Sequence, residues 1–251
     1  MRIRADYHTH TRYSHGKGTV RDNVLSAISR GLSEVAISDH GPAMIGIGVK
    51  RDAWPRLVED IRRCRDEFPG IKVLAAIEAN VTSIDGDVDI PPEIDCALDM
   101  RLVGIHLQIV GRSLNDTMRL VVNNLTAARW TRAMSRVARI DNTKALVEAV
   151  YRHRIDIVTH PGLHVNIDTA ELARACASRG TAMEINSYHA RGGVEYVKTA
   201  AKQGVRFALS SDAHHPRDVG RVDAAIRIAE KAGLGPDQII NVEMQDEADP
   251  K

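Results

Sequence analysis

The sequence predicts an α/β barrel in which seven parallel strands alternate with helices. Short apolar runs and amphipathic runs alternate over about 220 residues, as in chains built from repeated β–α units. The length of 251 residues fits one such barrel or two small domains. Polar residues able to do chemistry follow nearly every apolar run. Because parallel strands need right-handed crossovers, this repeat closes most simply into one barrel.

Each apolar run has the length of a strand, and most are followed by a helical pattern. Strands are expected at residues 1–7, 35–38, 71–77, 98–105, 155–159, 182–185 and 205–210. Helices are expected at residues 20–30, 54–67, 169–178, 194–202 and 219–232. Thr19 is expected to cap the first helix, and Gly180 to end the third. The first helix is expected to turn Val24, Leu25 and Ile28 towards the core.

Residues 111–153 interrupt the regular repeat. Two or three helices are expected there, at about 115–127 and 141–153 with a basic stretch between them. The basic residues recur at helical spacing and are Arg129, Arg132, Arg136 and Arg139. This face would attract an anionic substrate, but a solvated helix surface is the interpretation we favour. Residues 84–92, which carry aspartates at alternate positions, are expected to form a solvated loop.

The composition excludes several classes of protein. A net charge of +1 and an aromatic content of 4% argue against a main partner that is bulk nucleic acid, a long single strand or an anionic membrane. The three cysteines are scattered, as expected in a reducing compartment. The first residues do not resemble a signal peptide, and no apolar run approaches the ~20 residues needed to cross a bilayer. We therefore expect a cytoplasmic protein.

The residues that follow the predicted strands form a consistent chemical set. In chain order they are His8 and His10, His40, Glu78, His106, His160, Asn186, and Asp212 with His214. In a barrel of this kind the carboxyl ends of the strands converge on one mouth. Neutral imidazoles with carboxylates suit Zn²⁺, Mn²⁺ or Fe²⁺, and this set exceeds what one ion can use. We therefore predict more than one metal ion, with His153 and His164 left at the surface.

These residues lie in motifs that resemble one known family. The motifs are His8-Thr9-His10-Thr11, Ser38-Asp39-His40, Thr159-His160-Pro161-Gly162 and Ser211-Asp212-Ala213-His214, with the isolated Glu78 and His106. The chain is similar over nearly its whole length to the PHP family, named for polymerase and histidinol phosphatase. Glu184-Ile185-Asn186 adds a resemblance to its small stand-alone trinuclear phosphoesterases. The resemblance implies a distorted seven-stranded, TIM-like (βα)₇ barrel over residues 1–243, followed by a flexible acidic tail at 244–251.

The resemblance also implies three divalent metal ions, which would be zinc, manganese or iron. His8, His10, Glu78 and Asp212 would hold the first ion; His15, His40 and His214 the second; and Glu78, His106 and His160 the third. His15 follows His10 one residue sooner than in some relatives, and the stretch 107–150 is longer than theirs.

The implied activity is hydrolysis of a small phosphomonoester by water activated between metal ions. Asp212, His189 and the third ion are candidates for handling the proton of the leaving group. Arg191 is the preferred candidate for clamping the phosphate, and Arg12 is the alternative. Asp39 is expected to orient a histidine ring.

The sequence is compatible with other substrates and other activities. The substrate would be a small phosphorylated compound such as histidinol phosphate, or the 3′- or 5′-phosphate of a nucleotide, without a stable nucleic-acid complex. A metal-dependent amidohydrolase is less favoured, because those barrels bridge their ions with a lysine and no lysine ends a strand here. A non-catalytic metal-binding protein is less favoured because it would be expected to have lost some of the ligands. The oligomeric state is not determined by the sequence.

Overall fold

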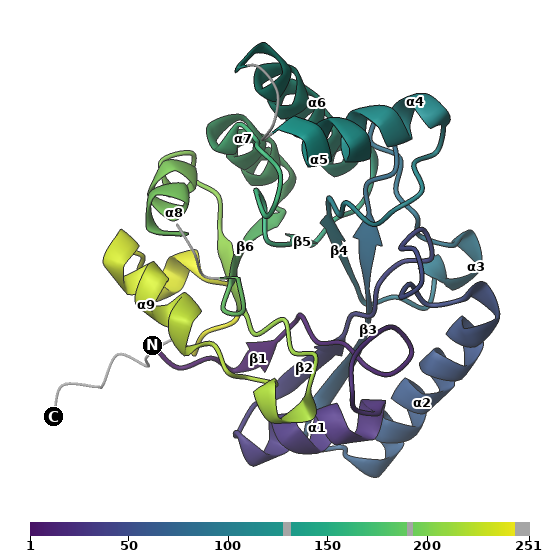
Figure 1. Cartoon of the computed structure of the whole chain (residues 1–251). Helices are drawn as coiled ribbons and strands as arrows, with labels where there is room; N and C mark the ends of the chain where they lie inside the picture. The colour runs from purple at the N-terminus through teal and green to yellow at the C-terminus, as the bar shows by residue number, and fades with distance from the viewer. Residues whose placement is uncertain (128–131, 190–192, 244–251) are drawn as a thin grey trace, which may run out of the picture.

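Seven parallel strands, hydrogen-bonded in chain order from β1 to β7, form a nearly closed barrel surrounded by helices (Figure 1). This computed structural model describes residues 1–127, 132–189 and 193–243. The strands are β1 (Ala5–Asp6), β2 (Glu34–Ile37), β3 (Lys72–Asn80), β4 (Met100–Gly104), β5 (Ile157–Val158), β6 (Ala182–Asn186) and β7 (Phe207–Ser210). The predicted α/β barrel of seven strands is thus confirmed, although most strands are shorter than the apolar runs that predicted them.

The two faces of the sheet carry side chains of different size. Inside the barrel the strands contribute mostly small residues, among them Ala36, Ala76, Ala182 and Ala208. The larger core lies between the strands and the outer helices. Because side chains alternate along a strand, Glu78 points to the same side as Ala76. The interior column of apolar residues therefore ends, at the carboxyl edge, in a carboxylate.

Asn241 closes the gap that remains between β7 and β1. Its side-chain amide donates to the carbonyl oxygens of Ala5 and Leu209 and accepts the Leu209 N–H, at 2.7–3.0 Å. The backbone of the same segment accepts from the Arg4 N–H and donates to the Phe207 carbonyl. At the opposite, carboxyl edge, Thr9 and Ala213 join the two ends by a parallel bridge. The sequence had given no sign of the role of this segment.

Helices follow the strands on the outside of the barrel. The main ones are α1 (Val20–Ser29), α2 (Trp54–Glu67), α6 (Arg132–Arg152), α7 (Thr169–Arg179), α8 (Gly193–Ala201) and α9 (Asp223–Ala232). Shorter pieces are η1 (Arg51–Ala53), α3 (Pro92–Asp95), α4 (Leu114–Thr117), the π-helical turn η2 (Met118–Val122), α5 (Asn123–Ala127), η3 (Pro216–Asp218) and η4 (Pro236–Gln238). Among the described residues, none of the helices combines the length and the apolar character that crossing a bilayer requires.

The ends of α1 and α7 lie where the sequence predicts them, but the buried face of α1 differs from the prediction. Thr19 caps α1 in a reciprocal capping box, and Gly180 ends α7 with a left-handed backbone, as predicted. The prediction that α1 buries Leu25 and Ile28 is wrong, because these side chains are 38% and 41% exposed. The helix instead buries Asn23, whose amide donates to the His10 carbonyl oxygen. This hydrogen bond sets the rotation of the helix, which an apolar count cannot detect.

One loop prediction and one helix boundary also need correction. The stretch 84–92 is not simply solvated, because Asp89 is largely buried and accepts from the Asn80 and Ala43 N–H groups. The last helix begins at Asp223, several residues later than expected, because the turn η3 precedes it.

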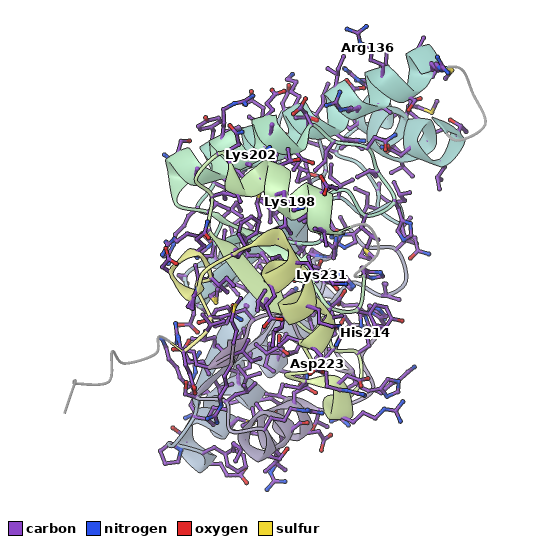
Figure 2. The ribbon with its side chains drawn as sticks, turned by 90° about the vertical axis from the view of Figure 1, so that its left-hand side faces the viewer. Arg136, Lys198, Lys202, His214, Asp223 and Lys231 are labelled. Carbon is purple, nitrogen blue, oxygen red and sulfur yellow. The ribbon has the colours of Figure 1, made fainter. Side chains whose placement is uncertain are left out.

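The described parts of the region 111–153, which are residues 111–127 and 132–153, pack beside the barrel as a layer of helices. Figure 2 shows this layer extending beyond the barrel, with Arg136 near its far end. Of the predicted basic face, Arg139 forms an ion pair with Asp168, the residue that caps α7. Arg129 lies outside the described residues, as does the predicted tail at 244–251.

Candidate metal centre

The carboxyl ends of the strands meet at one mouth, and the predicted metal ligands lie there together. The ends of β1 and β7 are laced by backbone hydrogen bonds, in which the His10 N–H donates to the Ala213 carbonyl and the Ala213 N–H to that of His8. This lacing brings His8 and His10 beside Asp212 and His214. Residues from opposite ends of the chain are therefore held in one cluster.

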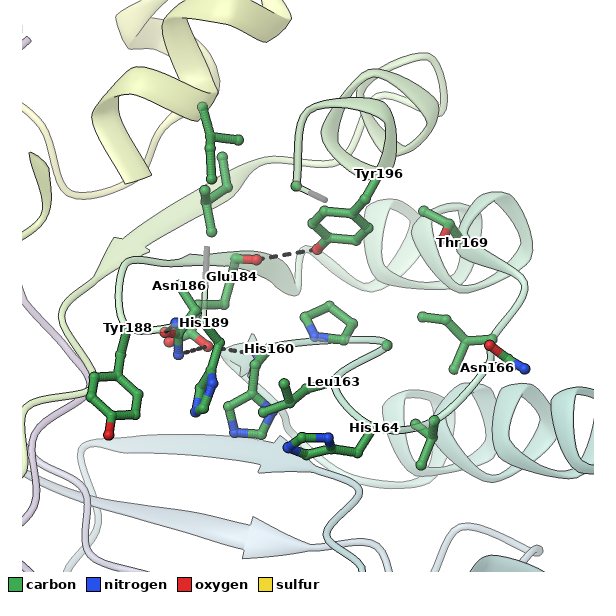
Figure 3. Close-up of a pocket in the computed structure, with 17 residues that line it drawn as sticks. His160, Leu163, His164, Asn166, Thr169, Glu184, Asn186, Tyr188, His189 and Tyr196 are labelled. Atoms are coloured by element: carbon green, nitrogen blue, oxygen red, sulfur yellow. Dashed lines mark hydrogen bonds between the residues drawn. The ribbon is translucent and has the colours of Figure 1, made fainter. Parts of the chain in front are cut away.

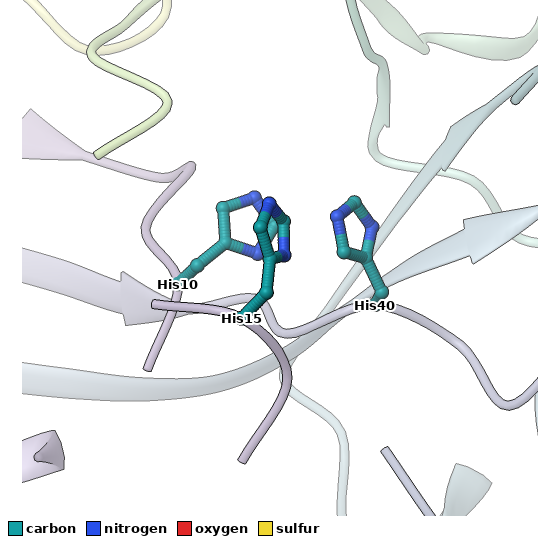
Figure 4. A group of neighbouring side chains, drawn as sticks. All are labelled: His10, His15 and His40. Atoms are coloured by element: carbon teal, nitrogen blue, oxygen red, sulfur yellow. The ribbon is translucent and has the colours of Figure 1, made fainter. Parts of the chain in front are cut away.

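The donor atoms of the cluster lie close enough to share cations. Four groups of three residues have donor atoms within 4.8 Å of one another: His10–His15–His40, His8–Glu78–His160, His8–His10–Asp212 and His40–Glu78–His106. Figure 4 shows the first of them, with its three rings close together. His214 joins the edge, its ring centre 4.5 Å from that of His10 and 4.1 Å from that of His15. All nine residues predicted to ligate metal are thus brought together.

Glu78 is the centre of the cluster. It is fully buried, and its Oε1 atom lies 2.8 Å from His160 Nε2 and 3.2 Å from His106 Nε2. Its Oε2 atom lies 2.8 Å from His40 Nδ1 and 3.3 Å from His8 Nε2. One carboxylate therefore faces imidazoles on both sides, as a carboxylate that bridges two ions would.

Several of these atoms are buried without a hydrogen-bond partner in the described structure. They are His10 Nδ1, His15 Nδ1, His40 Nδ1 and Glu78 Oε2, of which the last two lie 2.8 Å apart without the angles of a hydrogen bond. An unsatisfied buried polar group costs about 1–3 kcal/mol, so four in one cluster are expensive for a site that only packs. Imidazole nitrogens and carboxylate oxygens are the donors that divalent metal ions take. The residues present therefore fit a metal centre.

The protonation states of four of these groups suit metal binding. Burial lowers the pKa of His10 well below its usual value and that of His15 to about 4, so both rings are neutral. Burial opposes ionisation of Glu78 and Asp212, but the neighbouring histidines outweigh it and hold the pKa of both well below their usual range. Neutral imidazoles and ionised carboxylates are the forms that ligate a metal. At His8 and His160 burial opposes the charged form, but the nearby carboxylates outweigh it and raise the pKa, so a bound metal ion would displace a proton from these two rings.

Two of the residues in the cluster have unusual backbones. His160 and Asp212 lie in the left-handed region, with φ of 25° and 55°. Non-glycine residues avoid this region at a cost of order 1–3 kcal/mol, and such strain persists where the surroundings impose it. At Asp212 the surroundings are the laced strand ends and Asn186, which donates to Asp212 Oδ2 at 3.1 Å.

A buried carboxylate that was not among the predicted site residues supports the cluster from β6. Glu184 accepts from His8 Nδ1 at 2.7 Å and from the His160 backbone N–H at 2.6 Å. It therefore fixes one ring and one strand end, as carboxylates behind metal-binding histidines do. The signal was its position two residues before Asn186, on the same face of an otherwise apolar strand. Asn80, two residues after Glu78, holds His106 Nδ1 in the same way at 2.7 Å.

The role predicted for Asp39 is corrected by its contacts. It does not hold a histidine ring but accepts from the Thr11 N–H and hydroxyl and from the Ser14 hydroxyl. These bonds shape the loop that carries His15. Asp39 therefore positions His15 by holding the loop on which this histidine lies.

The other candidates lie around the rim. His189 is half-buried, with its Nε2 atom 3.6 Å from Asp212 Oδ2. Arg12 is exposed, and Arg191 lies outside the described residues. His153 contacts the Gly86 carbonyl, away from the cluster. His164 is exposed as predicted, but it lines the mouth of the cluster.

Comparison with known proteins agrees with the fold and with a phosphatase activity. The chain is 28% identical to "Probable phosphatase Teth514_1060" of Thermoanaerobacter sp. (strain X514), over 97% of this chain and 92% of that protein. It is 30% identical to "Probable phosphatase TTE1963" of Caldanaerobacter subterraneus, over 96% and 88%. A Lactococcus lactis histidinol phosphate phosphatase, solved with zinc, L-histidinol and phosphate, shares the fold with a TM-score of 0.64 and 16% identity, over 94% and 95%.

Barrel, cluster and relatives together define a metal-dependent phosphoesterase. The sequence profile of the PHP domain matches residues 6–188, and the chain belongs to the PHP domain family. The predicted family and the predicted class of activity are therefore confirmed.

Proposed function

We propose that this protein hydrolyses a small phosphomonoester at a centre of three divalent ions, which are zinc, manganese or iron. The observation that carries the proposal is the number of donors: nine residues converge, and four buried donor atoms have no other partner. A tetrahedral ion uses four ligands and an octahedral one six, so one ion cannot satisfy the set.

The overlaps between the four groups support a shared centre. His8, His10, His40 and Glu78 each belong to two of the groups. The group of His8, His10 and Asp212 matches the ligands implied for the first ion. The implied second and third sets are mixed in the structure, because His40 groups with His10 and His15 on one side and with Glu78 and His106 on the other. Glu78, between these groups, is the bridging ligand of the proposal.

Bound divalent ions would acidify water and neutralise charge on the phosphoryl oxygens. The chain supplies the positioning. Asn186 links two groups able to move a proton, because its Nδ2 atom donates to Asp212 Oδ2 and its Oδ1 atom accepts the His189 N–H. In the proposal, Asp212 and His189 handle the proton of the departing alcohol, and Asn186 positions the Asp212 carboxylate and the His189 backbone. Arg191, two residues beyond His189, is proposed to clamp the phosphate.

A monoesterase assay with controlled metal content tests the proposal. Protein stripped with a chelator and reloaded with Mn²⁺ or Zn²⁺ should hydrolyse p-nitrophenyl phosphate, and the stripped protein should not. Bis(p-nitrophenyl) phosphate, a diester with the same leaving group, should react at least about a hundredfold more slowly. A preference for the diester would replace the monoester proposal. Equal activity with and without metal would refute the role of the cluster.

A further inference from the structure

A second and larger cavity lies beside the metal centre, between the loop after β5 and the loop after β6 (Figure 3). Its volume is about 750 Å³, against about 370 Å³ for the space over the cluster. The two spaces share four lining residues, which are His160, Leu163, His164 and His189. They therefore adjoin, and a phosphoryl group held at the cluster would have its leaving group next to the larger cavity.

One side of this cavity is apolar. Leu163, Ile167 and the ring of Tyr196 line it, together with the buried Ile185 and Ile228. The Tyr196 hydroxyl donates to the Glu184 carbonyl oxygen at 3.2 Å, so its polar end is already satisfied. Figure 3 shows Asn166 and Thr169 on the side away from Tyr188 and His189. A space of this size that combines an apolar side with several polar groups has the character of a small-molecule pocket.

The charges around the cavity disfavour a second anion. Among the described residues that line it there is no lysine or arginine. The one carboxylate, Glu184, is engaged by His8 and by the His160 N–H. A second phosphate entering here would lose its water without gaining a counter-charge from these residues. Rings, by contrast, meet histidine and tyrosine side chains: His189 has its ring centre 6.4 Å from that of His164 and 4.8 Å from that of Tyr188.

We propose that this cavity binds the leaving group, and that the substrate is the phosphomonoester of an uncharged alcohol carrying a ring. The inference rests on the proposed monoesterase activity and narrows its substrate class. Sugar bisphosphates and polynucleotides fall outside this class. Ile167, in the cavity wall, is then a specificity-determining residue that does not take part in catalysis.

Two alkyl phosphates with similar leaving groups separate recognition from chemistry. 2-Phenylethyl phosphate carries a ring, and propyl phosphate does not. The metal-loaded protein should prefer the former by at least about tenfold in kcat/KM, because the ring is buried in the apolar cavity. Ile167→Arg should bring this preference to within about twofold while leaving propyl phosphate hydrolysis nearly unchanged. Ile28→Arg, on the exposed face of α1, is the matched control and should change neither rate.

Binding supplies a readout independent of turnover and of the variants. Calorimetry with the non-hydrolysable 2-phenylethylphosphonate and propylphosphonate should show the same preference in the wild-type protein. Equal affinities and equal kcat/KM values, or a preference for fructose 1,6-bisphosphate over both esters, would overturn the leaving-group assignment and leave the phosphatase intact. If no monoester is hydrolysed by metal-loaded protein, the proposed function fails, and this inference fails with it.

Discussion

The two ends of the barrel treat buried polar groups in opposite ways. At the amino end, Glu34 accepts from Arg4 and from the Tyr7 hydroxyl, and Asn241 makes three hydrogen bonds that close the barrel. At the carboxyl end, histidines and carboxylates lie close together, and several of their donor atoms have no hydrogen-bond partner. Of the eight buried side-chain atoms without a partner in the described structure, four lie in this cluster.

This difference separates what holds the fold from what does chemistry. Glu34 and Asn241 are hydrogen-bonded within the protein and therefore contribute to stability. The polar groups in the cluster that lack a partner are satisfied only when something else is bound. Substitutions at the carboxyl end should therefore lower activity more than stability, and substitutions at the amino end should lower stability more than activity.

The largest effect is expected from Asp212→Asn at the carboxyl end. The change keeps the size of the side chain but removes a ligand charge, so kcat/KM should fall by about a thousandfold. The thermal midpoint of the metal-free protein should fall only slightly, because the amide keeps the size of the side chain and loses only the attraction between the carboxylate and the neighbouring histidines. Glu34→Gln at the amino end is the matched control and should keep activity within about twofold. A large fall in the thermal midpoint of Asp212→Asn would instead make the cluster structural.

Asn241→Ala should give the complementary result. It leaves the Leu209 N–H and two carbonyl oxygens without partners at the barrel closure, and should lower the free energy of unfolding by about 3 kcal/mol. The folded fraction should keep its kcat/KM, because the side-chain hydrogen bonds of Asn241 do not reach a residue of the cluster. Urea unfolding measures the loss, with Asn115→Ala on the exposed surface as the control. Unchanged stability would contradict the closure role.

A smaller effect is expected from Glu184→Gln. The amide still fills the space but holds His8 and the His160 N–H less strongly, so metal affinity should fall by about 10- to 100-fold. Competition with a zinc chelator measures this affinity, and saturating metal should restore much of the activity. A loss of kcat/KM that saturating metal does not reduce would instead place Glu184 in the chemistry itself.

The sequence predicted the contents of the mouth better than its surroundings. Parallel strands must end at one edge, so the position of each histidine after a strand was enough to bring His8, His106 and His160 together. The rotation of α1 about its axis could not be predicted, because it depends on the hydrogen bond from the Asn23 amide to the His10 carbonyl oxygen in the loop after β1. The closure by Asn241 likewise depends on a contact between chain ends, and nothing local in the sequence marks it.

The same limit applies to the leaving-group cavity. Leu163 and Ile167 follow a predicted strand, but only the fold brings them against Tyr196 and Ile228. Long-range packing therefore shapes the proposed leaving-group cavity, whereas local motifs supply the proposed metal ligands.

The most direct test of the central claim is the metal content of the folded protein. Protein loaded with excess Zn²⁺ or Mn²⁺, freed of unbound metal and measured by plasma emission spectrometry should retain about three ions per chain, and Asp212→Asn should retain fewer. A wild-type protein that keeps one ion or none, with its fold intact, would contradict the account of the carboxyl-end cluster.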